Sequence, residues 1–243
     1  MKTAIFEKTG LIALAFGCML MLSCQTNVLQ GQTVKETRDV SSFDGVALAF
    51  SGDIIITQGS PQQVVIEADK NSMEIIETKM EGSKLVLKTR NGNWHNLGPV
   101  KVYITMPAVG YLSVSGSGDM ICETGIKTNE IDLEVSGSGS IRINMLEATE
   151  ISSVITGSGD ISVSGNGGEQ NELDVTITGS GSFKAGDLAV GEADVNITGS
   201  GSATVNVVKE LETNITGSGS VLYKGKPLVN ATATGSGKTR SVN

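Results

Sequence analysis

Apolar and polar residues alternate in short runs along the C-terminal half of the chain, and each run ends at the tripeptide Gly-Ser-Gly. The position two before each first glycine is apolar in every copy, and alternation with period two is typical of a strand with one buried face. The tripeptide begins at seven positions spaced 18 to 22 residues apart: Gly116, Gly137, Gly157, Gly179, Gly199, Gly217 and Gly235. The apolar residues before it are Val114, Val135, Ile155, Ile177, Ile197, Ile215 and Ala233.

The same alternation resumes after the tripeptide, so each repeat reads as strand, Gly-Ser-Gly corner, strand. A repeat near 20 residues is typical of a solenoid, in which each coil stacks on the previous one. The pattern predicts an all-β fold, a single-stranded parallel β-helix with coils of 18–22 residues and Gly-Ser-Gly corners. In such a stack Phe183 is expected to lie over Ala203, a large side chain against a small one.

The fourteen corner glycines need a physical reason. Each glycine costs roughly 0.5–1 kcal/mol relative to alanine in regular structure. A sharp corner with φ > 0, repeated in every coil, would justify that cost. The serine between the two glycines is then expected to point outward.

The N-terminal half is less regular, and residues 40–110 are expected either to cap the regular coils of 111–243 or to form irregular coils as a broader first section of the same helix. Residues 46–57 resemble a degenerate copy of the repeat, with Ser51-Gly52-Asp53 at the corner. Further strands are predicted at Val64–Glu67, Met73–Met80, Leu85–Lys88 and Val100–Met106.

The chain begins with an uncharged apolar run, Leu11–Leu22, which is too short to span a bilayer and suits a signal peptide over residues 1–23. Met21-Leu22-Ser23-Cys24 resembles a bacterial lipobox, in which Cys24 becomes the acylated first residue. A plain secretion signal is the alternative. Residues 24–39 are polar and without pattern, and they are predicted to be a flexible tether to a β-helix domain over 40–243.

Composition narrows the function classes. The net charge is −8 and no basic patch is present, which excludes nucleic acid as a partner and leaves only a lipid anchor for membrane contact. Beyond Cys18 and Cys24 the only cysteine is Cys122, in an inward column, so it is interpreted as core. The single histidine, His95, has no metal-ligand spacing or nucleophile motif beside it, so no catalytic set, metal or cofactor is predicted.

Two acidic columns on the outward faces are weighed as sites. Asp119 and Asp160 share one column with Ser140 between them, about 9.6 Å apart, near the upper limit for an inverting pair of carboxylates. A solvated edge is the favoured interpretation. The second column contains Asp132, Asp174, Asp194 and Glu212, interrupted by Ser152, and is either a calcium-bridged ladder or a solvated acidic face.

Hydroxyl side chains form the candidate binding surface. Together they would make a strip about 29 Å long, able to hydrogen-bond a repeating polymer at several coils. The alternative is that serine and threonine simply suit a strand end and a tight corner. One column is Ser115, Ser136, Thr156, Thr178, Thr198, Thr216 and Thr234, and its neighbour is Ser117, Ser138, Ser158, Ser180, Ser200, Ser218 and Ser236. Trp94, in the loop of residues 91–98, is a further candidate, since an exposed indole stacks on sugar rings.

The lipobox-like start, Phe43-Asp-Gly-Val46, Ser51-Gly-Asp53 and the repeated Val-Ser-Gly-Ser-Gly-Asp and Ile-Thr-Gly-Ser-Gly-Ser resemble the head-GIN-domain family of putative auto-transporter adhesins. The resemblance implies a right-handed, pectin-lyase-like β-helix without a catalytic set, acting in adhesion. We therefore expect an outer-membrane lipoprotein, on the periplasmic or cell-surface side, that binds a glycan or a protein surface. A polysaccharide-active enzyme and a purely structural envelope protein remain as alternatives.

Overall fold

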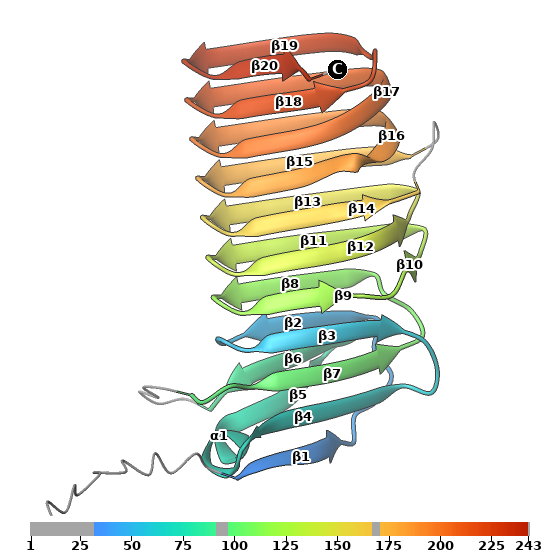
Figure 1. Cartoon of the computed structure of the whole chain (residues 1–243), viewed down its shortest axis with the longest axis vertical. Coiled ribbons are helices and arrows are strands. Elements are labelled where there is room, and N and C mark those ends of the chain that lie inside the picture. Colours follow the sequence, from blue (N-terminus) through green and yellow to red (C-terminus); the bar gives the residue numbers. More distant parts are fainter. Residues whose placement is uncertain (1–31, 91–96, 167–170, 243) are drawn as a thin grey trace, which may run out of the picture. The chain divides into compact units, whose positions relative to one another are not determined.

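Most of the chain consists of strands stacked on one another in parallel (Figure 1). The computed structural model describes residues 32–90, 97–166 and 171–242, and its strands belong to the compact unit Gly31–Asn243. The described residues contain twenty strands and one short helix, α1 (Lys70–Ile75). The prediction of an all-β, mainly parallel solenoid is confirmed.

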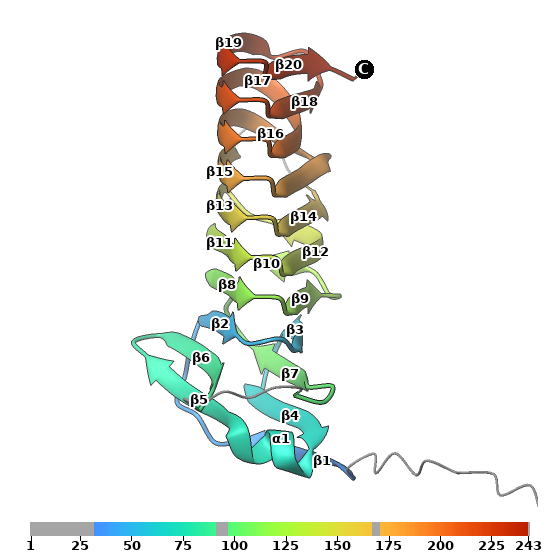
Figure 2. The same ribbon diagram turned by 90° about the vertical axis from the view of Figure 1, so that its left-hand side faces the viewer.

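Each regular coil has one strand on either side of its corner, and the two sets of strands form two faces (Figure 2). The strands that lead into a corner are β8 (Tyr111–Gly116), β11 (Glu130–Gly137), β13 (Glu150–Gly157), β15 (Glu172–Gly179) and β19 (Leu228–Gly235). The strands that leave one are β9 (Asp119–Cys122), β12 (Ser140–Glu147), β14 (Asp160–Gly165), β18 (Ser220–Lys224) and β20 (Lys238–Ser241). Two long strands, β16 (Ser182–Gly199) and β17 (Ser202–Gly217), run through a complete coil from one corner to the next, and β10 (Ile126–Lys127) is a short third side.

Equivalent residues of successive coils pair in register. Val135, Ile155 and Ile177 are direct partners in β11, β13 and β15, and all three are buried. Phe183 pairs with Ala203, as the sequence predicts, so the largest buried side chain of the regular coils faces one of the smallest. The unequal coil lengths are absorbed away from the corners, because the register shifts lie in the second halves of the coils.

The two glycines of a corner are required for different reasons. The first has φ between 115° and 124° in all seven copies, the left-handed region predicted for it. At Gly179 a Cβ would in addition overlap the carbonyl oxygen of Gly157 in the coil before. At Gly181 the difficulty is space, since a Cβ would lie 2.5 Å from both the Gly159 carbonyl oxygen and Ile155 Cγ2. The positive φ thus favours glycine at the first position, and the close stacking of neighbouring coils leaves no room for a Cβ at either position.

Residues 46–57 do form a coil of the same kind, as predicted. Strand β2 (Gly45–Ala49) pairs in parallel with β8, and β3 (Asp53–Gln58) pairs in parallel with β9. On their other side β2 and β3 pair with β6 (Lys84–Thr89) and β7 (Lys101–Met106). The coil that comes first in the chain is therefore sandwiched between later strands.

Beyond that coil antiparallel pairs appear, which agrees with the expected cap, so the alternative of successive irregular coils over 40–110 is wrong in part. Strand β4 (Gln63–Asp69) is antiparallel to β7, and β5 (Ile76–Glu81) is antiparallel to β6. A tight turn at Gly82, with φ 64°, joins β5 to β6. Such a turn can connect antiparallel strands, whereas parallel strands need a longer crossing. This region ends the solenoid with a cap, drawn at the foot of Figure 1.

Two local predictions are also corrected. Residues 33–38, predicted to belong to the tether, form β1 (Thr33–Arg38), antiparallel to β4, and Lys35 pairs with Glu67 at 3.0 Å. None of its residues is buried, so neither face of this strand requires apolar side chains and its sequence carries no alternation. The strand predicted over 73–80 begins only at Ile76, because Asp69 caps α1 by accepting hydrogen bonds of 3.0 Å from the N–H groups of Asn71 and Ser72.

Candidate functional site

The two predicted hydroxyl columns, Ser115 to Thr234 and Ser117 to Ser236, are brought together at the corner edge of the solenoid. We call their fourteen serine and threonine side chains the hydroxyl strip. Partners such as Thr156 and Thr178 lie in register, and every member of the strip is exposed. None of the fourteen hydroxyls makes a hydrogen bond to another described residue.

The backbone beneath the strip is fully engaged. The N–H of Ser180 donates to the Gly157 carbonyl at 2.8 Å, and the N–H of Ser200 donates to the Gly179 carbonyl at 2.8 Å. The same bond recurs in the other corners from Ser138 to Ser236, at 2.8–2.9 Å. The strip is therefore a row of free hydroxyls on a rigid support, with a spacing of about 4.8 Å between coils. Each hydroxyl can both donate and accept a hydrogen bond.

The outward carboxylates Asp119 and Asp160 each have a polar partner on a neighbouring coil. Ser140 lies between them in register, and its hydroxyl donates to Asp119 at 2.6 Å. Asp160 pairs with Lys184 at 3.5 Å. The sequence interpretation missed Asp53, which pairs with Asp119 from the degenerate coil, although its place after Ser51-Gly52 corresponds to that of Asp119 after Ser117-Gly118.

The acidic face is larger than predicted. Asp132, Asp174, Asp194 and Glu212 form one column with Ser152 between the first two, as expected. The structure adds a parallel column of glutamates seven residues before each corner, a spacing that the sequence also contains: Glu130, Glu150, Glu172, Glu192 and Glu210. Within the described residues no group of three or more His, Cys, Asp or Glu side chains is arranged to hold a metal ion.

Electrostatic crowding on this face is greatest at Asp194. Partial burial, and then the charges of Glu212 and Asp174, raise the pKa of its carboxyl group, although Asn196 donates a hydrogen bond of 2.9 Å to it. The column is thus a set of like charges that destabilise one another. It repels anionic ligands.

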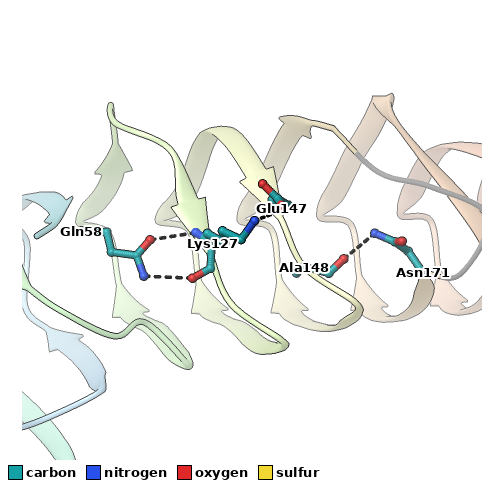
Figure 3. Close-up of polar contacts among 5 residues, drawn as sticks. All are labelled: Gln58, Lys127, Glu147, Ala148 and Asn171. Atoms are coloured by element: carbon teal, nitrogen blue, oxygen red, sulfur yellow. Dashed lines mark hydrogen bonds and ion pairs between the residues drawn. The ribbon is translucent and has the colours of Figure 1, made fainter.

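A polar hollow of about 660 Å³ lies at the opposite end of the strands from the hydroxyl strip. We call it the turn-side groove, and it is lined by Lys127, Thr128, Asn129, Glu147, Ala148, Thr149, Asn166 and Asn171. Figure 3 shows Gln58 reaching Lys127 from the N-terminal coil, Lys127 paired with Glu147, and Asn171 donating to the carbonyl of Ala148. Sequence reasoning missed this groove because its residues belong to turns of differing length.

A second hollow, of about 870 Å³, lies in the cap between β1, α1 and β5. Val34, Met73 and Ile76 line it together with residues of both charges. Arg38 spans its wall, pairing with Glu36 at 3.1 Å and reaching the carbonyl oxygen of Met73 at 3.5 Å. Most of the charged side chains that line this hollow form ion pairs with each other or with adjacent residues.

Three further residues carry predictions from the sequence. Cys24 and Trp94 lie outside the described residues, so their predicted roles stay predictions. Cys122 is buried in the inward column, as expected for a core residue, and burial raises the pKa of its thiol to about 12. Of the binding surface predicted from the sequence, the described part of the chain therefore contains the hydroxyl strip and not the Trp94 side chain.

A match to the sequence model of a protein family shows which family this chain belongs to. The family described as putative auto-transporter adhesin, head GIN domain, matches residues 42–227. The chain belongs to this family. The matched region of this head-GIN-domain chain spans β2 to the turn before β19.

Solved structures share the fold of this head-GIN-domain chain. A putative adhesin from Bacteroides fragilis aligns with a TM-score of 0.81 and 24% identity over 87% of this chain and 97% of the other. A putative adhesin and a putative lipid binding protein, both from Parabacteroides distasonis, align with TM-scores of 0.72 and 0.71 and identities of 22% and 23%. Each alignment covers 88% of this chain and 98% of the other.

No curated protein matches this chain. In the described part of the chain, no helix is long and apolar enough to cross a membrane.

Proposed function

We propose that this protein is a non-catalytic, lipid-anchored adhesin of the cell envelope that holds an extended glycan or a protein surface along its hydroxyl strip. The observation that carries the proposal is the strip itself. Fourteen exposed hydroxyls repeat in register on a rigid edge, and none of them is used within the described structure. A partner with a matching repeat would gain a weak contact at each coil and a useful affinity over several.

Charge supports a neutral partner. The aspartate and glutamate columns lie four and six residues before the first hydroxyl column on the same strands, so a polyanion lying across this face would meet repulsion. The same argument disfavours degradation of acidic polysaccharides. Asp119 and Asp160 also support a non-catalytic function, because Ser140 and Lys184 already hold them on an open strand face.

The lipid anchor is proposed at Cys24, which would place the protein on the outer membrane, facing the periplasm or the cell exterior. Nine Cα–Cα steps lead from Cys24 to Thr33, where β1 begins. Fully extended, they reach about 30 Å at most. The cap would then stay near the bilayer. Cys24→Ala should release the protein into a soluble fraction, and membrane fractionation that does not change would refute this anchor.

The binding surface is tested by charge substitution. Thr178→Lys, Thr198→Lys and Thr216→Lys together place cations on three successive coils at exposed positions, so the thermal melt should change little. Binding to the partner found on a glycan array, or by envelope-protein pull-down, should be lost. The matched control, Thr176→Lys with Thr204→Lys and Thr232→Lys, changes outward threonines that lie off the strip. Binding retained by the folded strip variant would refute the strip and redirect attention to Trp94.

A further inference from the structure

We infer that the turn-side groove is a second binding site, specific for a neutral saccharide and independent of the hydroxyl strip. Asn129 and Thr149 precede β11 and β13, whereas the strip lies at the corners where these strands end. Each strand has eight residues, which corresponds to about 26 Å. A ligand in the groove would therefore leave the strip free.

The walls of the groove are held in place from several coils. The side chain of Gln58 accepts a hydrogen bond of 2.7 Å from the N–H of Lys127 and donates one of 3.0 Å to its carbonyl oxygen. It also donates to the Pro107 carbonyl at 3.3 Å. This clamp joins the N-terminal coil to the first wall (Figure 3).

The turns that form the other walls are fixed through their backbones. The Asn129 carbonyl accepts hydrogen bonds of 2.9 Å from the N–H groups of both Thr149 and Glu150. The Thr149 carbonyl accepts one of 2.8 Å from the N–H of Glu172. A ligand would therefore meet a site that is formed before binding, which lowers the entropic cost of association.

The side chains that face the groove remain available. Within the described residues Asn129, Thr149 and Asn166 make no side-chain hydrogen bond, and Asn171 uses only its Nδ2 group. Each amide offers donors and acceptors together, and the threonine hydroxyl offers both as well. Adjacent donors and acceptors on a fixed frame match the hydroxyl groups of a sugar ring, each of which also donates and accepts.

Charge selects among sugars. Lys127 and Glu147 are register partners on β10 and β12 and pair with each other, so the lining of the groove carries no net charge. Glu130, Glu150 and Glu172 stand beside it at the starts of their strands. A uronic acid or a phosphate would be repelled, and no group of three or more His, Cys, Asp or Glu side chains in the described residues is arranged to hold a divalent cation. A neutral oligosaccharide is the ligand class that remains.

The test uses the purified full-length protein with four tetrasaccharides: chitotetraose, cellotetraose and mannotetraose as neutral probes, and tetragalacturonate as the anionic one. Backbone NMR signals of residues 127–129, 147–149 and 171 should shift with at least one neutral probe and not with tetragalacturonate. No shift with any neutral probe, or equal shifts with tetragalacturonate, would overturn the inference.

The matched variants separate this site from the strip. Asn129→Ala with Asn166→Ala removes two free amides and should weaken the neutral probe at least tenfold while leaving the melt unchanged. Asn230→Ala, an exposed asparagine on β19 at the far end of the solenoid, should leave the affinity unchanged. Asn129→Asp keeps the side-chain shape and adds a charge, so it should weaken binding without a folding defect.

The strip variant with three lysines should bind the neutral probe in the groove as the unaltered protein does, whether or not the strip itself has a partner. If it instead loses the probe while the double alanine variant retains it, the groove is not the site. If the strip has no partner and the groove binds, the proposed function fails and this inference stands.

Discussion

The backbone N–H of Ser180 donates a 2.8 Å hydrogen bond to the carbonyl oxygen of Gly157, one coil earlier in the stack. This contact requires the corner backbones of neighbouring coils to approach so closely that no Cβ fits on Gly179 or Gly181. The serine side chain between those two glycines is exposed and meets no such limit. The corner is therefore defined by its glycines, and the serine is free for the surface.

Substitution at the corner should separate these roles. Gly179→Ala must adopt a positive φ and overlap the Gly157 carbonyl, so we expect a loss of about 3 kcal/mol or more in the free energy of unfolding. Ser180→Ala, the control, should stay within about 0.5 kcal/mol. Urea denaturation measures both, and equal losses would contradict this explanation of the corner.

Two of the buried hydroxyls, those of Ser153 and Thr213, differ in their hydrogen bonding. Ser153 Oγ is buried between Leu133 and Val175 with no hydrogen bond, whereas Thr213 shares one of 2.8 Å with Thr239. Ser153→Ala should therefore stabilise the protein by about 1 kcal/mol, because an unpaired polar group leaves the core. Thr213→Val should instead destabilise it by about 1 kcal/mol. Thermal unfolding that ranks the two variants in the reverse order would refute this.

Stability should depend on the charge of Asp194. Because its pKa is raised in the folded state, the folded protein keeps this proton to higher pH than the unfolded chain, whose value is about 4. Ionisation therefore lowers stability as pH rises from about 4 through the folded pKa, and protonation restores it. Asp194→Asn should be more stable than the unaltered protein at pH 7 and should lose this part of the pH dependence. Asp132→Asn, beside Ser152, is the control in urea melts between pH 4 and 8 and should gain less.

The thiol of Cys122 should be unreactive in the folded protein. It is buried, and its pKa is raised to about 12 by that burial, so almost no thiolate exists at pH 8. Iodoacetamide should label it only after unfolding in urea. Rapid labelling at pH 8 without denaturant would show that the inward column opens, and labelling of Cys122→Ser, the control, would reveal another reactive group.

The sequence by itself determined the regular coils. Three features repeat in every coil: the corner spacing, the inward apolar residues and the outward hydroxyls. The strand and corner assignment that fits one coil therefore fits every copy. Because each coil contacts mainly its neighbours, local alternation and the repeat length are enough to pair Ile155 with Ile177 and Phe183 with Ala203 in adjacent coils. The first glycine of each corner could likewise be assigned from the backbone demand alone.

Tertiary structure decided the cap and the turn-side groove. Strand β1 has no apolar alternation and exists because β4 offers it a partner, and the coil of β2 and β3 lies between strands that come later in the chain. The groove joins Gln58 to Lys127 across 69 residues, and turns of differing length supply its walls. Such contacts depend on which segments pair over long distances, and unlike the corners they leave no periodic pattern in the sequence.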